Sequence, residues 1–101
     1  MDEQQRVAAF VEQRGLETPP EYRVLDLASE VGELAKDANE STAYGSDPDG
    51  LEIESDEIGD ALFALLALAD SLEIDAGEAI EEALEKYEER LAETDSPGSG
   101  E

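Results

Sequence analysis

Apolar side chains recur at helical spacing in four stretches of the chain, and turn-forming residues separate these stretches. The spacing predicts helices over residues 2–14, over residues 20–43, from a start between Leu51 and Ser55 to about Leu72, and from Asp75 to about Ala92. The pattern therefore predicts an all-α protein with four helices.

Residues at the predicted helix ends carry recognisable start and stop signals. Asp2 is suited to cap the first helix, and Gly15 ends it. Residues 44–50 are a loop by composition. Asp75 is followed three residues later by Glu78, a capping-box arrangement at the start of the fourth helix.

The chain reads as one domain with a polar tail. A length of 101 residues suits a single small domain. Residues 94–101 are rich in Gly, Ser and Pro and are expected to be disordered. We therefore predict one helical domain over residues 1–93, with no internal repeat and no Gly-rich phosphate loop.

Residues 61–69 form an unbroken apolar run of nine residues. This run is too short to span a membrane. A helix that is apolar on every side is expected to be buried on every side. In a chain this small, such burial predicts a partner subunit that supplies part of the cover.

The charge balance narrows the classes of partner. The chain has 29 acidic and 6 basic residues, and its net charge of −23 repels nucleic-acid backbones and anionic membranes. Because 40% of the residues are hydrophobic, the excess charge indicates a salt-adapted, halophilic surface rather than a disordered acidic chain. The first fifteen residues hold no signal-like apolar core, so we expect a cytoplasmic protein.

Two acid pairs are candidates for a site: Glu30 with Glu33, and Glu57 with Asp60. The members of each pair are three residues apart and share one helix face. The face of Glu57 and Asp60 continues into the apolar residues 61–69, so it leads toward a buried surface. Glu30 and Glu33 lie beside the apolar stripe of their own helix, where a solvated flank is the alternative reading.

Gathering these four carboxylates at one helix junction requires compensation of charge. Two unit charges 4 Å apart repel by roughly 4 kcal/mol at an effective dielectric constant near 20. Raised pKa values or a bound divalent cation would relieve that repulsion. The chain contains neither His nor Cys, so a carboxylate site favours Mg²⁺, with Mn²⁺ or Ca²⁺ next. A di-iron bundle would need Glu-x-x-His pairs, and residues 44–50 lack the ligand pattern of an EF-hand.

The pattern Glu30-Val-Gly-Glu33, a spacer, and Glu57-Ile-Gly-Asp60 resembles the paired E-x-x-E and E-x-x-D motif of MazG-like nucleotide pyrophosphohydrolases. The match extends over about residues 20–92. The resemblance implies the all-α NTP pyrophosphatase fold, with helices packed across a homodimer or homotetramer interface. It also implies Mg²⁺-dependent cleavage of a nucleoside triphosphate between its α and β phosphates, giving nucleoside monophosphate and pyrophosphate.

The resemblance assigns roles to the acids by their position in the motif. It implies that Glu30, Glu33, Glu57 and Asp60 bind the metal. One of these acids, or a neighbouring one, would then orient or deprotonate the attacking water. The expected role in the cell is the removal of non-standard or surplus nucleoside triphosphates.

Basic residues that could hold the substrate phosphates are few. Lys86 and Arg90 are four residues apart on one face of the fourth helix and are the first candidates, with ion pairing to nearby Glu residues as the alternative. Many relatives carry an acid directly before the first motif Glu and a Lys nearby, whereas this chain has Ser29 before Glu30. Lys36 is a candidate substitute, although the helical projection points it away from Glu30.

Two other functions remain open at this stage. A phosphoribosyl-ATP pyrophosphohydrolase would have a similar length, but it typically shows a Tyr-His pair after the motif, and this chain has no His. A non-catalytic acidic module that binds basic proteins would explain the charge, but not the inward face of Glu57. The preferred base cannot be read from the sequence, because Phe10, Phe63 and Tyr87 are expected to lie in the core.

Overall fold

The computed structural model describes residues 1–94, and the prediction of an all-α protein with four helices is confirmed. The elements are α1 (Asp2–Gln13), α2 (Pro20–Ser41), η1 (Pro48–Gly50, a 3₁₀ turn), α3 (Ser55–Ser71) and α4 (Ala76–Thr94). Residues 1–94 contain no strand and no helix that is long and apolar enough to cross a membrane. Apart from residue 94, the predicted disordered tail over residues 94–101 lies outside the described residues.

The helix ends agree with most of the start and stop signals. Asp75 is the cap of α4, since its Oδ1 accepts hydrogen bonds from the backbone N–H groups of Gly77 at 2.8 Å and Glu78 at 3.2 Å. The prediction that Asp2 caps α1 is wrong, because Asp2 is already helical and Met1 occupies the cap position. Asp2 still lies in the first turn, where a negative charge complements the helix dipole.

Helix α2 ends at Ser41, two residues earlier than the periodicity predicts. Ala43 and Tyr44 adopt left-handed backbone conformations, with φ of 50° and 57°, which cannot continue a right-handed helix. The Thr42 hydroxyl donates to the Ala38 carbonyl at 2.6 Å and satisfies one of the last helical acceptors. The chain then loops back toward α3.

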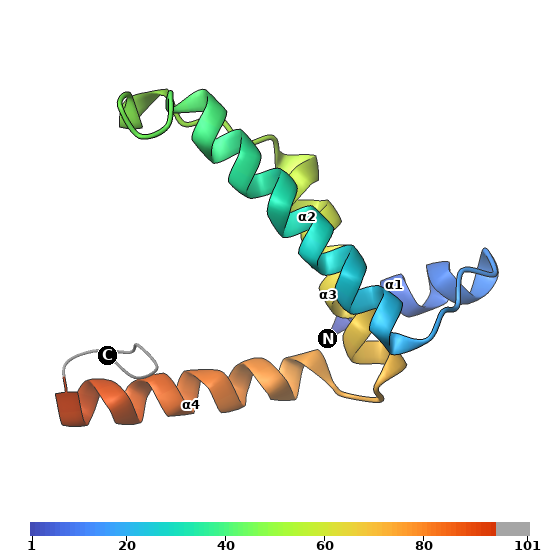
Figure 1. Ribbon diagram of the computed structural model, residues 1–101. Helices are drawn as coiled ribbons and strands as arrows, with labels where there is room; N and C mark the ends of the chain where they lie inside the picture. Colours follow the sequence, from blue (N-terminus) through green and yellow to red (C-terminus); the bar gives the residue numbers. More distant parts are fainter. Residues whose placement is uncertain (95–101) are drawn as a thin grey trace.

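The helices are arranged in an open V rather than a closed bundle (Figure 1). Helices α2 and α3 pack side by side as an antiparallel hairpin, and α1 packs on α3. Helix α4 contacts the end of α3 and then runs away from the hairpin. The radius of gyration is 16.5 Å, whereas a globular domain of this length has a value of about 13 Å.

The open shape leaves little apolar surface buried within one chain. Three apolar residues, all on α3, are buried among residues 1–94: Ala64, Leu66 and Ala67. The other side of α3 is open, since Leu62 is 44% exposed and Leu65 is 46% exposed. The expectation that residues 61–69 are buried on every side is therefore not met within a single chain.

Helix α4 carries an uncovered apolar stripe. Its members are between 38% and 47% exposed: Ile80, Leu84, Tyr87 and Leu91. These residues recur three or four positions apart, so they form one face of the helix. A soluble helix normally buries such a face against another element.

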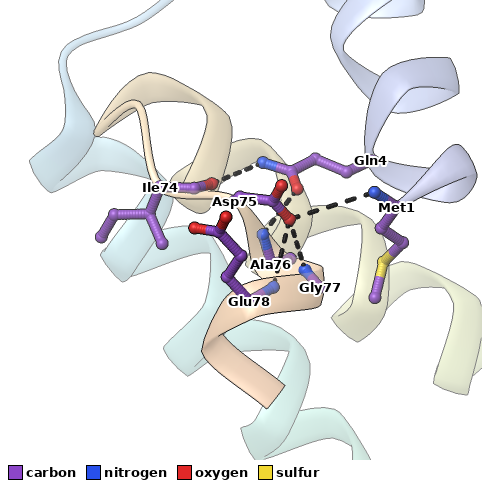
Figure 2. A network of polar contacts seen from close by, with 7 residues as sticks. All are labelled: Met1, Gln4, Ile74, Asp75, Ala76, Gly77 and Glu78. Atoms are coloured by element: carbon purple, nitrogen blue, oxygen red, sulfur yellow. Dashed lines mark hydrogen bonds and ion pairs between the residues drawn. The ribbon is translucent and has the colours of Figure 1, made fainter. Parts of the chain in front are cut away.

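A buried glutamine fixes the start of α4 to α1 (Figure 2). The side chain of Gln4 donates from Nε2 to the Ile74 carbonyl at 2.7 Å, and its Oε1 accepts from the Ala76 N–H at 2.7 Å. The Met1 ammonium lies 4.0 Å from the Asp75 carboxylate. These contacts hold the connection between α3 and α4 in place.

Candidate functional site

Acids from α2 and α3 face each other across two hollows. The first has a volume of about 230 Å³ and is lined by Asp26 and Glu30 of α2 and by Asp60, Phe63 and Ala64 of α3. The second has a volume of about 380 Å³ and is lined by Asp37, Glu40 and Ser41 at the end of α2 and by Glu52, Glu54 and Glu57 around the start of α3. The antiparallel hairpin therefore places Glu30 with Asp60, and Glu57 with Asp37.

The first hollow lies against the small core of the protein. Its wall includes Ala64, which is 2% exposed, so the face of Asp60 does lead into buried surface, as the helical projection predicts. Asp26 pairs with Arg23 at 3.6 Å, and Arg23 also donates to the Leu16 carbonyl. Arg23 therefore supplies one positive charge beside this hollow and ties the start of α2 to the preceding loop.

The second hollow is shaped by the loop that joins α2 to α3. The backbone N–H of Glu52 donates to the Ser41 hydroxyl at 2.9 Å, which holds the segment before α3 against the end of α2. Gly50 makes this approach possible, because a Cβ at that position would lie 2.7 Å from the Ser41 carbonyl oxygen. The loop thus brings Glu52 and Glu54 next to acids of α2.

The acids around the second hollow raise the pKa of Glu57. A side-chain hydrogen bond with Asp37, followed by burial and the negative charges of Asp37, Asp56 and Glu54, raises the pKa of Glu57 from 4.5 to about 7. Its Oε2 atom is buried and has no hydrogen-bond partner within residues 1–94. The acids around the second hollow therefore favour the protonated form of Glu57.

The other predicted site residues are more scattered. Glu33 and Lys36 lie on α2 and are exposed, and neither lines the two hollows. Lys86 and Arg90 lie on the half of α4 that runs away from the hairpin (Figure 1). The Lys86 ammonium lies over the Tyr87 ring, 5.4 Å from its centroid. Within one chain, these two basic residues are therefore not brought to the acids.

The chemistry of these donors fits a hard divalent cation. No three acids among residues 1–94 are close enough together to enclose a metal ion. Mg²⁺ does not need such a cage, because it keeps several waters and combines one or two carboxylates with substrate phosphates. A cation would contact the unpartnered oxygen of Glu57. It would also offset the repulsion that raises the pKa of Glu57.

The structure adds acids that the motif does not contain. Asp37, Glu52 and Glu54 share the second hollow with Glu57. Asp37 was readable in part, since it lies four residues after Glu33 on the same ridge of α2. Glu52 and Glu54 precede α3 in a non-helical segment, so helical periodicity gives no signal for them.

Comparison with known proteins agrees with the motif. The family model described as the MazG nucleotide pyrophosphohydrolase domain matches residues 19–93, a span that takes in α2, α3 and nearly all of α4. A curated protein of Bacillus subtilis (strain 168), the uncharacterized protein YpjD, is 41% identical over 69 residues, which are 63% of this chain and 60% of that protein. The chain thus spans about three fifths of the length of this relative. No solved structure matches the chain.

Proposed function

The chain belongs to the MazG nucleotide pyrophosphohydrolase family, whose model matches residues 19–93, and from this premise we propose that it hydrolyses nucleoside triphosphates. The reaction adds water across the anhydride bond between the α and β phosphates. The products are a nucleoside monophosphate and pyrophosphate. The proposed role is the removal of non-standard or surplus nucleoside triphosphates in the cytoplasm of a salt-adapted cell.

The observation that carries the proposal is the meeting of acids from the two motif helices. Glu30 of α2 and Asp60 of α3 line one hollow, although 29 residues separate them in the chain. Glu57, three residues before Asp60, opens toward the second hollow and its additional acids. A purely solvated acidic surface would not require acids from two helices to meet in this way. The arrangement therefore supports a carboxylate site for a cation and a polyphosphate.

The protein's own residues supply binding and proton transfer in this proposal. Glu30, Glu33, Glu57 and Asp60 are the proposed metal-binding residues, one or two of them for each ion, with Mg²⁺ as the metal and Mn²⁺ as an alternative. When bound, the metal neutralises phosphate charge and orients the substrate. One of these acids, or a neighbouring one, would orient the attacking water and take up its proton.

We also propose that the active protein is a homodimer or homotetramer. The apolar stripe of α4 and the open side of α3 are uncovered in the single chain, and a second copy would bury them. In such an assembly Lys86 and Arg90 could meet the acids of a neighbouring copy and contact the substrate phosphates. This arrangement would add positive charge near the acids, beside which Arg23 supplies one positive charge within a single chain.

A substrate panel tests the proposed reaction. The wild-type protein is incubated in high salt, with and without Mg²⁺, with the standard nucleoside triphosphates, dUTP, and oxidised or deaminated forms. The expected result is Mg²⁺-dependent release of pyrophosphate and a nucleoside monophosphate from at least one substrate. Release of orthophosphate instead, or no release from any substrate, would contradict the proposal.

A further inference from the structure

Arg23 is a buried charged residue that the proposed reaction does not use. It is 8% exposed, and it is the one charged residue that is buried among residues 1–93. Arginine side chains are almost never fully buried unless they are paired. The contacts of Arg23 therefore indicate what its burial serves.

Two contacts hold the Arg23 guanidinium. Its Nη2 donates a hydrogen bond to the carbonyl of Leu16, in the segment that joins α1 to α2. Its Nη1 lies 3.6 Å from Oδ2 of Asp26, which is three residues further along α2. This second contact is an ion pair and is longer than a hydrogen bond. The Leu16 carbonyl thus fixes the guanidinium, and the fixed positive charge attracts the Asp26 carboxylate.

Asp26 borders the first hollow although it does not belong to the acid motif. It lines this hollow together with Glu30 of α2 and Asp60 of α3. Asp26 and Glu30 are four residues apart, so their side chains lie on one face of α2. The Asp26 side chain is 57% exposed, and an exposed side chain keeps its rotamer freedom unless another group restrains it. Arg23 is such a group, because its own side chain is buried.

The charges at the first hollow match those of a divalent cation. Three carboxylates line the hollow, and Arg23 contributes one positive charge beside them. Two formal negative charges are then uncompensated, and one divalent cation would neutralise both. Arg23 does not itself line the hollow, so its effect on the hollow is exerted through Asp26.

Stability alone does not account for the pairing of Arg23 with Asp26. An ion pair with an exposed member contributes little to the free energy of unfolding. The hydrogen bond to Leu16 ties α2 to the preceding segment without any help from Asp26. What the ion pair adds is the placement of a carboxylate at the hollow. Mg²⁺ keeps several waters in proteins, and the groups that hydrogen-bond around a metal site orient what the ion binds.

We propose that Arg23 is a positioning residue of the cation site, which holds Asp26 at the first hollow so that Asp26 accepts hydrogen bonds from the hydration water of the cation. This inference rests on the proposed function, because it takes Glu30 and Asp60 as metal-binding residues. It adds one carboxylate and one guanidinium to the site. Arg23 itself contacts neither the cation nor the substrate.

The test measures the binding of Mn²⁺ from the loss of the electron paramagnetic resonance signal of the free ion. We expect Asp26→Asn to raise the Kd for Mn²⁺ roughly tenfold, as is usual when an outer partner of a metal site is removed. Glu21→Gln is the matched control, since it removes an exposed carboxylate from the first turn of α2 that lines neither acidic hollow. It should keep the wild-type Kd.

Arg23→Gln separates positioning from charge. Through charge alone, the loss of a nearby positive charge would tighten the binding of a cation. Positioning predicts the opposite, a higher Kd than in the wild type. Because Arg23 acts through Asp26, the double variant should bind Mn²⁺ no more weakly than Asp26→Asn. Arg23→Lys keeps a positive charge near Asp26 and should recover part of the affinity.

Circular dichroism of the metal-free proteins shows which variants are folded. Asp26→Asn keeps the hydrogen bond between Arg23 and Leu16, so it tests the inference even if Arg23→Gln does not fold. An unchanged Kd in Asp26→Asn overturns the inference. A folded Arg23→Gln with an unchanged or lower Kd also overturns it, as does a wild type that binds no Mn²⁺.

The outcomes separate this inference from the proposed function. Pyrophosphate release by the wild type, combined with an unchanged Kd in Asp26→Asn, overturns the inference alone. Mn²⁺ binding that depends on Asp26 and Arg23 as expected, combined with no pyrophosphate release from any substrate, supports the inference and overturns the proposed reaction.

Discussion

Replacing Glu57 by glutamine separates the charge of the acidic site from its shape. Glu57→Gln removes a titrating carboxyl but keeps the length of the side chain and its capacity to hydrogen-bond with Asp37. In the metal-free protein the pKa of Glu57 is about 7, against an ordinary value of 4.5, chiefly because of the hydrogen bond with Asp37. The folded state therefore binds more protons than the unfolded state between these two pH values.

The sign of the effect follows from this difference in proton binding. Stability falls with rising pH wherever the folded state binds more protons, so the contribution of Glu57 is complete below pH 4.5 and is lost as the pH rises through 7. At about pH 5.75 the carboxyl is about 95% protonated in the folded state and about 5% in the unfolded state. The folded chain then holds about 0.9 more proton at this position.

Thermal unfolding followed by circular dichroism measures this effect. With a chelator present and in high salt, which screens the general repulsion of an acidic surface, the melting temperatures of the wild type and Glu57→Gln are compared from about pH 5 to about pH 8. We expect the variant to gain stability relative to the wild type as the pH rises. Glu88→Gln, which removes an exposed carboxylate of α4, should follow the wild-type profile.

Addition of Mg²⁺ should reverse the order of the two proteins. Binding at 100 times the dissociation constant stabilises a folded protein by roughly 2.7 kcal/mol, and Glu57→Gln should lose most of this gain together with most of its hydrolytic activity. A melting-temperature difference between the two proteins that stays constant across the pH range would refute the raised pKa. Full activity in a folded Glu57→Gln would refute its place in the site.

Two further predictions concern how the helices are held. Leu84→Glu places a charge in the apolar stripe of α4 and should convert the oligomer to a monomer, as measured by light scattering. Leu84→Met, which keeps the side chain apolar and of similar volume, should leave the oligomer intact. A wild type that is itself strictly monomeric would contradict the proposed assembly. Gln4→Ala leaves the Ile74 carbonyl and the Ala76 N–H without their partner and should lower the free energy of unfolding by about 1–3 kcal/mol in urea titrations. The exposed Gln5→Ala should change it by less than about 0.5 kcal/mol, and an equal loss in both variants would refute the role of Gln4 as a clamp.

Local pattern was sufficient to predict the helices and the nature of the donor atoms. The helical period of the apolar residues placed all four helices, and Asp75 could be identified as the cap of α4 from its spacing to Glu78. The absence of His and Cys restricted any metal site to oxygen ligands, of which the chain has mainly carboxylates. These features depend on residues a few positions apart, which is why they can be read without a fold.

The register between helices could not be read in this way. Glu30 shares a hollow with Asp60, but Glu57 faces Asp37, because the antiparallel packing of α2 and α3 decides which turns are opposite each other. The prediction grouped all four motif acids, since helical projection gives the face of a residue but not its height along a neighbouring helix. Glu52 and Glu54 reach the site only because Gly50 and Ser41 hold the loop close to α2.

The sequence by itself thus determined four helices, an excess of negative charge and two acid pairs on helix faces. Only the tertiary structure decided that Phe10 and Phe63 border an open hollow instead of filling a core, and that α4 leaves the hairpin with its apolar stripe uncovered. The physical reason is that the hydrophobic effect drives an apolar side chain out of water without specifying which surface covers it. The position of that side chain in the sequence therefore does not identify its packing partner. That choice depends on how distant segments pack, and in the single chain α4 and the open side of α3 are left without a covering element.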